Sequence, residues 1–133
     1  MANPDHLSIL KQGVHAWNAW RKENPDVEIN LSEVNFSLAG VFTGDLYFAN
    51  MTKANLTRAD LTGANFTGAN LTRAHLFGGN LTKANLTGAT FECANMTGTK
   101  LTDAFGEHVT GMIRHSQQGS LVPSEPTNCV SML

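Results

Sequence analysis

The 133-residue sequence has few of the side chains from which catalytic and metal sites are built. It contains two cysteines, Cys93 and Cys129, at a spacing that fits neither a CxxC motif nor a zinc site. Carboxylates are sparse, no acid–base pair stands out, and no Gly-rich phosphate loop is present. We therefore expect no catalytic residue, no cofactor and no metal. We also expect a chain with reduced thiols, in which Cys93 is an unpaired surface cysteine.

No charge sign dominates the sequence, and no long apolar run is present. The 9 Lys and Arg residues and the 11 Asp and Glu residues give a net charge of −2, so no general basic field attracts nucleic acid or anionic lipid. No apolar run approaches the roughly 18 residues that span a bilayer. Residues 1–10 lack the basic and apolar parts of a signal peptide. These absences predict a cytoplasmic protein that binds neither nucleic acid nor membrane.

Residues 1–28 differ in composition from the rest of the chain. Asn3 and Pro4 form a typical helix start, and Asn24-Pro25 is typical of a helix end. Between them runs an amphipathic stripe at helical spacing, made of Leu7, Leu10, Val14, Trp17 and Trp20. We predict one amphipathic α-helix that covers the end of the following element with its apolar side.

Large apolar residues then recur in steps of five. The fifteen centres are Leu31, Phe36, Val41, Leu46, Met51, Leu56, Leu61, Phe66, Leu71, Leu76, Leu81, Leu86, Phe91, Met96 and Leu101. On an α-helix a step of five turns by roughly 140°, so the centres scatter over every face. On a flat strand an odd step sends alternate centres to opposite sides. Neither element buries all of them.

A chain that bends after each short extended pentapeptide does bury them all. Four pentapeptides then close one coil of about 20 residues around a common axis. The position two before each centre also points inward and is usually Ala, while the flanking Asn or Asp and Thr point outward. A 20-residue coil places Asn30, Asn50 and Asn70 in one column. The axis is filled with Ala and Leu, so we expect no small-molecule substrate.

The phrase Ala-(Asn/Asp)-Leu-x-x resembles the repeat of the pentapeptide-repeat family over residues 29–103. The resemblance implies an all-β solenoid, a right-handed quadrilateral β-helix, here of about four coils. We expect residues 1–28 to form the N-terminal capping helix and its connector. Residues 104–133 are expected to form a short C-terminal cap, with Val109, Met112 and Ile113 on a short helix, and a flexible tail from Ser116.

Five apolar residues interrupt the polar outside of the repeat: Leu38, Phe42, Tyr47, Phe48 and Phe77. Either the terminal segments cover these side chains, or they form a patch for protein binding or self-association. The leading functional hypothesis is a non-enzymatic scaffold that binds an unknown protein partner or itself. The alternative, implied by family members that bind DNA gyrase as DNA mimics, is a DNA-mimic inhibitor or protector of DNA gyrase or topoisomerase. Mimicry needs a dense acidic surface, and the repeat has none.

Overall fold

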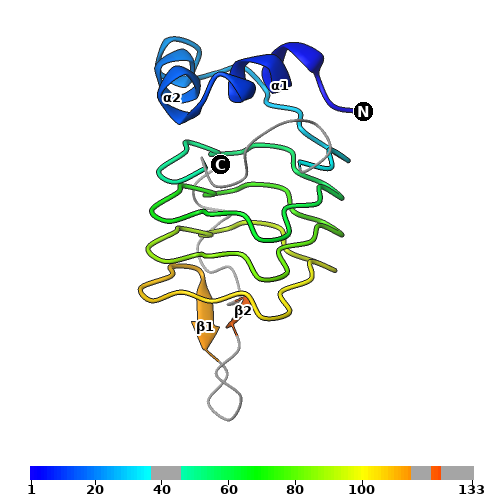
Figure 1. Ribbon diagram of the computed structural model, residues 1–133, viewed down its shortest axis with the longest axis vertical. Helices are drawn as coiled ribbons and strands as arrows, with labels where there is room; N and C mark the ends of the chain where they lie inside the picture. The colour runs from blue at the N-terminus through cyan, green and yellow to red at the C-terminus, as the bar shows by residue number, and fades with distance from the viewer. Residues whose placement is uncertain (37–45, 115–120, 124–133) are drawn as a thin grey trace.

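The computed structural model describes residues 1–36, 46–114 and 121–123. Helices α1 (Pro4–Lys11) and α2 (Val14–Glu23) lie across one end of a stack of coils, and strands β1 (Met112–Arg114) and β2 (Leu121–Pro123) lie at the other end (Figure 1). Two residues of the predicted patch, Leu38 and Phe42, lie outside the described residues, as does the tail from residue 124.

Successive coils are joined by isolated parallel bridges between residues 20 apart, such as Asn50 with Asn70 and Asn70 with Thr90. Each coil therefore contains four pentapeptides. At each corner a backbone bond closes a tight turn, as from the Ala54 N–H to the Met51 carbonyl at 3.0 Å. The residue just before the small inward residue takes a positive φ, 61° at Lys53 and 72° at Gly63. The chain thus has the stacked coils of a β-helix, although each bridge spans one residue.

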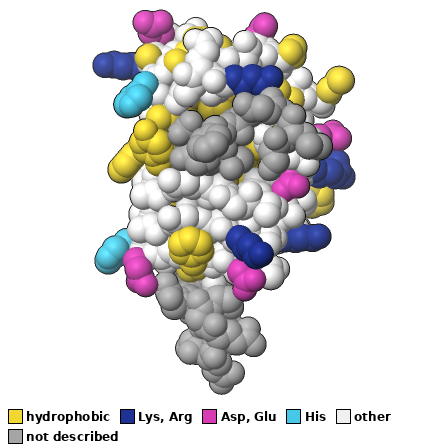
Figure 2. All heavy atoms as spheres, viewed as in Figure 1, with side chains coloured by type: hydrophobic (Ala, Val, Ile, Leu, Met, Phe, Trp, Pro, Cys, Tyr) yellow, Lys and Arg dark blue, Asp and Glu magenta, His cyan; other side chains and the backbone are white. Residues whose placement is uncertain are grey.

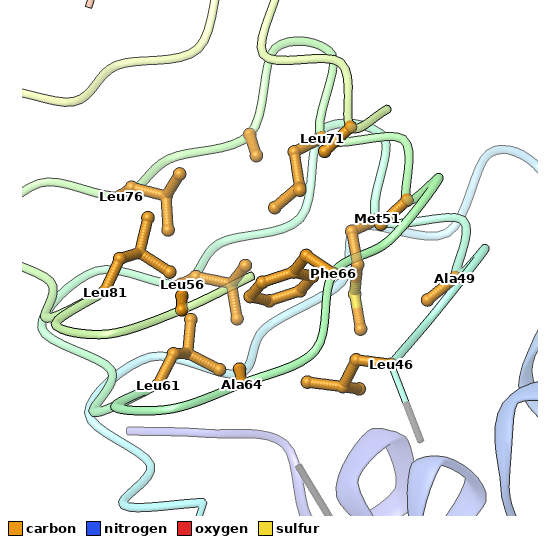
Figure 3. Close-up of a cluster of buried hydrophobic side chains, with 14 of the residues drawn as sticks. Leu46, Ala49, Met51, Leu56, Leu61, Ala64, Phe66, Leu71, Leu76 and Leu81 are labelled. Atoms are coloured by element: carbon orange, nitrogen blue, oxygen red, sulfur yellow. The ribbon is translucent and has the colours of Figure 1, made fainter. Parts of the chain in front are cut away.

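The centres and the small residues two before them fill the interior of the stack. Ten of these side chains, among them Leu56, Phe66 and Leu71, converge on the axis in Figure 3. Among the described centres only Leu101 is not fully buried, and Ala94 is the one partly exposed alanine at an inward position. Both lie in the last coil, which has no coil below it. The predicted division into inward and outward positions is confirmed.

The outward Asn and Thr of one repeat bond to each other. In the second coil Asn70 Oδ1 accepts from the Thr72 N–H at 3.0 Å and from the Thr72 hydroxyl at 2.6 Å. The same backbone bond recurs at Asp60 with Thr62 and at Asn95 with Thr97. This is an Asx-turn, which needs a short side-chain acceptor two residues before the donor. The Asn-x-Thr phrase therefore encodes the bend that follows each centre.

The first coil has a different length from the others. The predicted column is confirmed for Asn50 and Asn70, which bridge each other, but the placement of Asn30 in it is wrong. Asn30 bridges Asn55, and Asn35 bridges Asp60, both at a separation of 25 residues. The chain returns to the regular step by Phe48, whose N–H donates to the Thr67 carbonyl at 2.8 Å. One additional pentapeptide therefore lies between Phe36 and Leu46. An insertion of this length keeps the period of five, so the sequence pattern does not reveal it.

The N-terminal segment forms two helices where one was predicted. Gly13 separates them with a φ of 104°, a conformation that L-residues with side chains rarely adopt. Three members of the predicted stripe, Leu10, Val14 and Trp17, are buried as expected, and α2 ends at Glu23 before Asn24-Pro25. Trp20 is only partly buried and packs against Trp17, with ring centroids 5.6 Å apart.

The coils continue beyond residue 103, where the sequence phrase ends. Phe105 bridges Asn85, and Thr110 bridges Thr90. The short helix predicted around Met112 is wrong, because β1 pairs antiparallel with β2. Met112 and Leu121 are buried and belong to the core cluster. A hairpin thus provides the apolar cover at this end.

Candidate functional site

Helix α2 closes the open edge of the first coil by replacing the hydrogen bonds of a missing coil. One coil further on, the Asn70 N–H donates to Ala49, its carbonyl accepts from Met51, and the Thr72 carbonyl accepts from Lys53. In the first coil the three equivalent backbone groups bond to side chains of α2. The Asn50 N–H donates to Asn18 Oδ1 at 2.8 Å, and the Asn50 carbonyl accepts from Trp17 Nε1 at 2.9 Å. The Thr52 carbonyl accepts from Arg21 Nη2 at 2.7 Å. Asn18 Nδ2 also donates to the Phe48 carbonyl at 3.0 Å.

Helix α1 forms hydrogen bonds to a second side of the first coil in the same way. The Asn30 N–H donates to His6 Nδ1 at 3.1 Å, and the Asn30 carbonyl accepts from the Asn3 N–H at 2.9 Å. Burial lowers the pKa of His6; Asp5 opposes this shift and Arg21 adds to it. Burial also lowers the pKa of Arg21. A neutral His6 is what the bond requires, because only an unprotonated nitrogen accepts.

Tyr47 and Phe48 lie next to this cap, on the first coil. Their rings meet edge to face at 85°, with centroids 6.1 Å apart. Phe48 is 65% exposed, and its ring covers Gly68, where an added Cβ would lie 2.3 Å from a ring carbon. Because Gly68, one coil further on, has no side chain, the Phe48 ring can pack directly against the backbone there. Phe48 is held against the column and still presents most of its surface to solvent.

Phe77 lies apart from this pair. It belongs to the side of the column that contains Leu56 and Leu76, and that side is opposite the one containing Leu46 and Phe66. Its ring is 43% exposed, and the Arg58 guanidinium lies 6.0 Å from its centroid. The described members of the predicted patch therefore form two separate sites, Tyr47–Phe48 and Phe77–Arg58.

Besides the N-terminal Met1, two further exposed large apolar side chains of the described residues were not among the predicted residues. Phe105 is 53% exposed and Val27 is 39% exposed. Phe105 occupies the outward position that holds Asn in most repeats, so its signal was present in the sequence. It was missed because the repeat was taken to end at residue 103. The face of the molecule in Figure 2 shows apolar side chains in separate places and charges of both signs between them.

Cys93 is disulfide-bonded, so the expectation of an unpaired surface thiol is wrong. The prediction rested on sequence spacing alone, which does not report which cysteines the fold brings together. The bond also removes the argument for a reducing compartment, because that argument assumed reduced thiols. Among the residues that the structure describes, no cluster of three or more His, Cys, Asp or Glu side chains is arranged to hold a metal ion.

Comparison with known families matches this architecture. Residues 45–76 and 69–105 match the profile described as pentapeptide repeats, with 8 copies. Residues 45–105 are a pentapeptide-repeat domain. The predicted resemblance is thus confirmed over residues 45–105. No curated protein sequence matches the chain significantly.

Two solved pentapeptide-repeat proteins are similar to the chain. One comes from the thylakoid lumen of Arabidopsis thaliana, with 34% identity and a TM-score of 0.53, and the match covers 60% of this chain and 52% of that one. The other comes from the cyanobacterium Cyanothece 51142, with 33% identity and a TM-score of 0.45, covering 61% of this chain and 59% of that one. The chain thus spans little more than half of each pentapeptide-repeat relative. No helix in the described part of the chain is long and apolar enough to span a membrane.

Proposed function

We propose that this pentapeptide-repeat protein is a non-enzymatic scaffold that binds another protein, or a second copy of itself, through its outer surface. The interior supports this proposal, because side chains such as Leu56, Phe66 and Leu71 are fully buried on the axis. Chemistry or small-molecule binding needs a lined cavity. A column filled with Ala and Leu offers its outside as the functional surface.

The observation that carries the proposal is the exposure of Phe48 on a rigid support. Aromatic side chains, Phe included, are enriched at the buried core of protein interfaces relative to the rest of the surface. The ring of Phe48 rests on Gly68, and its backbone is tied to α2 through Asn18. Because the ring is already positioned, a partner that covers it loses little conformational entropy on binding. Tyr47 adds a neighbouring ring with a polar tip.

A comparison of two aromatic variants tests the proposal. Phe48→Ser and Phe77→Ser each remove one exposed ring, and neither touches the axis. We expect sedimentation equilibrium and affinity capture with purified wild-type bait to show a self-complex or a reproducible partner that Phe48→Ser loses by at least about tenfold in affinity, as for a residue at the centre of an interface. Phe77→Ser is expected to retain the binding. Unchanged binding by Phe48→Ser would contradict this assignment.

The alternative, gyrase inhibition by DNA mimicry, has no observation in its favour. A mimic of DNA needs closely spaced acidic side chains, and the outward corner positions carry Lys53, Arg58, Arg73 and Lys83. A supercoiling assay is the direct check. We expect no inhibition at stoichiometric protein, and dose-dependent inhibition would reverse the ranking of the two functions.

A further inference from the structure

Helix α1 is attached to the first coil through a histidine. The His6 ring is buried, and its Nδ1 accepts the Asn30 N–H at 3.1 Å. Histidine is the side chain whose charge ordinarily changes between about pH 5 and pH 8. We propose that α1 is an acid-released flap, which protonation of His6 frees from the first coil while α2 stays in place. The proposal does not depend on the scaffold function.

Protonation turns the contact between His6 and Asn30 from attractive to repulsive. The acceptor Nδ1 becomes a second N–H donor of the ring, and it then faces the donor N–H of Asn30. A buried charge and a buried donor without an acceptor are both unfavourable. When the flap opens, both groups return to water. Binding of a proton to His6 therefore favours the open flap.

The charged groups that act on His6 belong to α1 and α2. Burial is the main cause that lowers the pKa of His6; Asp5, on the same helix, opposes this shift, and Arg21, on α2, adds to it. The first coil presents an uncharged backbone N–H to the ring. The ion pair between the Met1 ammonium and Glu33, at 3.9 Å, is exposed and contributes little. The ring has an ordinary pKa in the open form, so the flap is closed above about pH 6.5 and opens as the pH falls through the lower folded pKa.

The connection between the two helices allows α1 to move by itself. Gly13 lies between them with a φ of 104°, and an added Cβ there would meet no atom within 4 Å. A glycine in open surroundings is a suitable hinge. Helix α1 has 8 residues, and a helix of this length depends on its packing contacts. Its Leu10 is buried in the same core cluster as Ile29 and Leu31, so opening of the flap uncovers part of that cluster.

The bonds from α2 to the first coil do not respond to acid in the same range. Asn18 accepts the Asn50 N–H at 2.8 Å, and neither Asn18 nor Trp17 has a titratable side chain. The guanidinium of Arg21 remains protonated. Acid therefore acts differently on the two sides of the cap. The Asn30 N–H loses its acceptor, and the Asn50 N–H keeps its acceptor.

Amide hydrogen exchange measured by NMR tests the flap with two amides of the same protein. Exchange at Asn30 and Asn50 is expressed as protection factors, which remove the intrinsic pH dependence of exchange. From about pH 7.5 to about pH 5 we expect the Asn30 amide to lose protection, with a midpoint below about pH 6.5, and the Asn50 amide to keep it. Equal losses would show that acid opens the whole cap. Unchanged protection at Asn30 would show that His6 does not control α1, and either result overturns the proposal.

His6→Asn is the matched variant for this experiment. Its side-chain oxygen lies two bonds from Cβ, as Nδ1 does, so it can accept the Asn30 N–H, and it does not titrate. We expect the Asn30 protection factor of His6→Asn to be the same at both pH values. His15→Asn, at an exposed place on α2, should keep the wild-type response. A wild-type acid response in His6→Asn, or its loss in His15→Asn, would contradict the proposal. If His6→Asn does not fold, the comparison of the two wild-type amides decides.

Discussion

The cap formed by α2 predicts that Asn18→Ala destabilises the protein. The substitution removes two hydrogen bonds, from the Asn50 N–H at 2.8 Å and to the Phe48 carbonyl at 3.0 Å. Each contributes about 0.5–1.5 kcal/mol net, so about 1–3 kcal/mol is lost. Alanine regains about 0.6 kcal/mol of helix propensity inside α2. The expected net loss is about 0.5–2.5 kcal/mol.

His15→Ala is the matched control for this substitution. His15 lies on α2, is exposed, and has nearly the same helix propensity as asparagine. We expect it to be neutral or slightly stabilising. Urea unfolding followed by circular dichroism gives both free energies, and the difference between the variants should be about 1–3 kcal/mol. If Asn18→Ala and His15→Ala change the free energy of unfolding equally, α2 does not replace a coil in the way its bonds indicate.

Three other predictions test the column and its ends. Leu71→Lys places a charge on the buried axis without a partner and should abolish folding, whereas Thr72→Lys, one residue on and facing outward, should change the Tm little; similar losses in circular dichroism melts would contradict the inward and outward assignment. Because the pKa of His6 is lower in the folded protein than in the unfolded chain, acid protonates the unfolded chain first and favours unfolding. The contribution of His6 to stability is therefore complete above about pH 6.5 and is lost as the pH falls from there through the lower folded pKa. Wild type should therefore lose more Tm between pH 7.5 and pH 5 than His6→Gln, and equal losses would contradict this role of His6. Gly68→Ala should move the Phe48 ring and alter its NMR shifts, while Gly88→Ala, with a similar φ but no ring above it, should leave them unchanged; unchanged shifts in both would show that the ring does not rest on Gly68.

The inside and outside of the column follow directly from the sequence. A step of five leaves one geometry that buries the described centres, such as Leu56, Phe66 and Leu86. Each Asn-x-Thr phrase forms its own turn from neighbours two residues apart. Both rules act within a single repeat, so local sequence is sufficient for them. The match of residues 45–105 to pentapeptide repeats depends on the same local rules.

The candidate sites were only partly predictable. Tyr47, Phe48 and Phe77 were recognisable because each replaces a polar residue at an outward position. Whether these side chains lie close together depends on which side of the coil each one occupies. To assign the sides, the number of residues in each coil must be known. The additional pentapeptide before Leu46 makes the first count 25 and the others 20, without disturbing the period of five.

The sequence by itself determined the repeat, its buried residues and its bends, because these depend on contacts within about five residues. Only the tertiary structure decided which coil residues lie side by side, which helix groups close the first coil, and that Cys93 is bonded. These features depend on contacts between segments far apart in the chain, as between Asn18 and Asn50. Such contacts depend on how many residues each coil contains. A pattern that is the same in every pentapeptide does not specify that number.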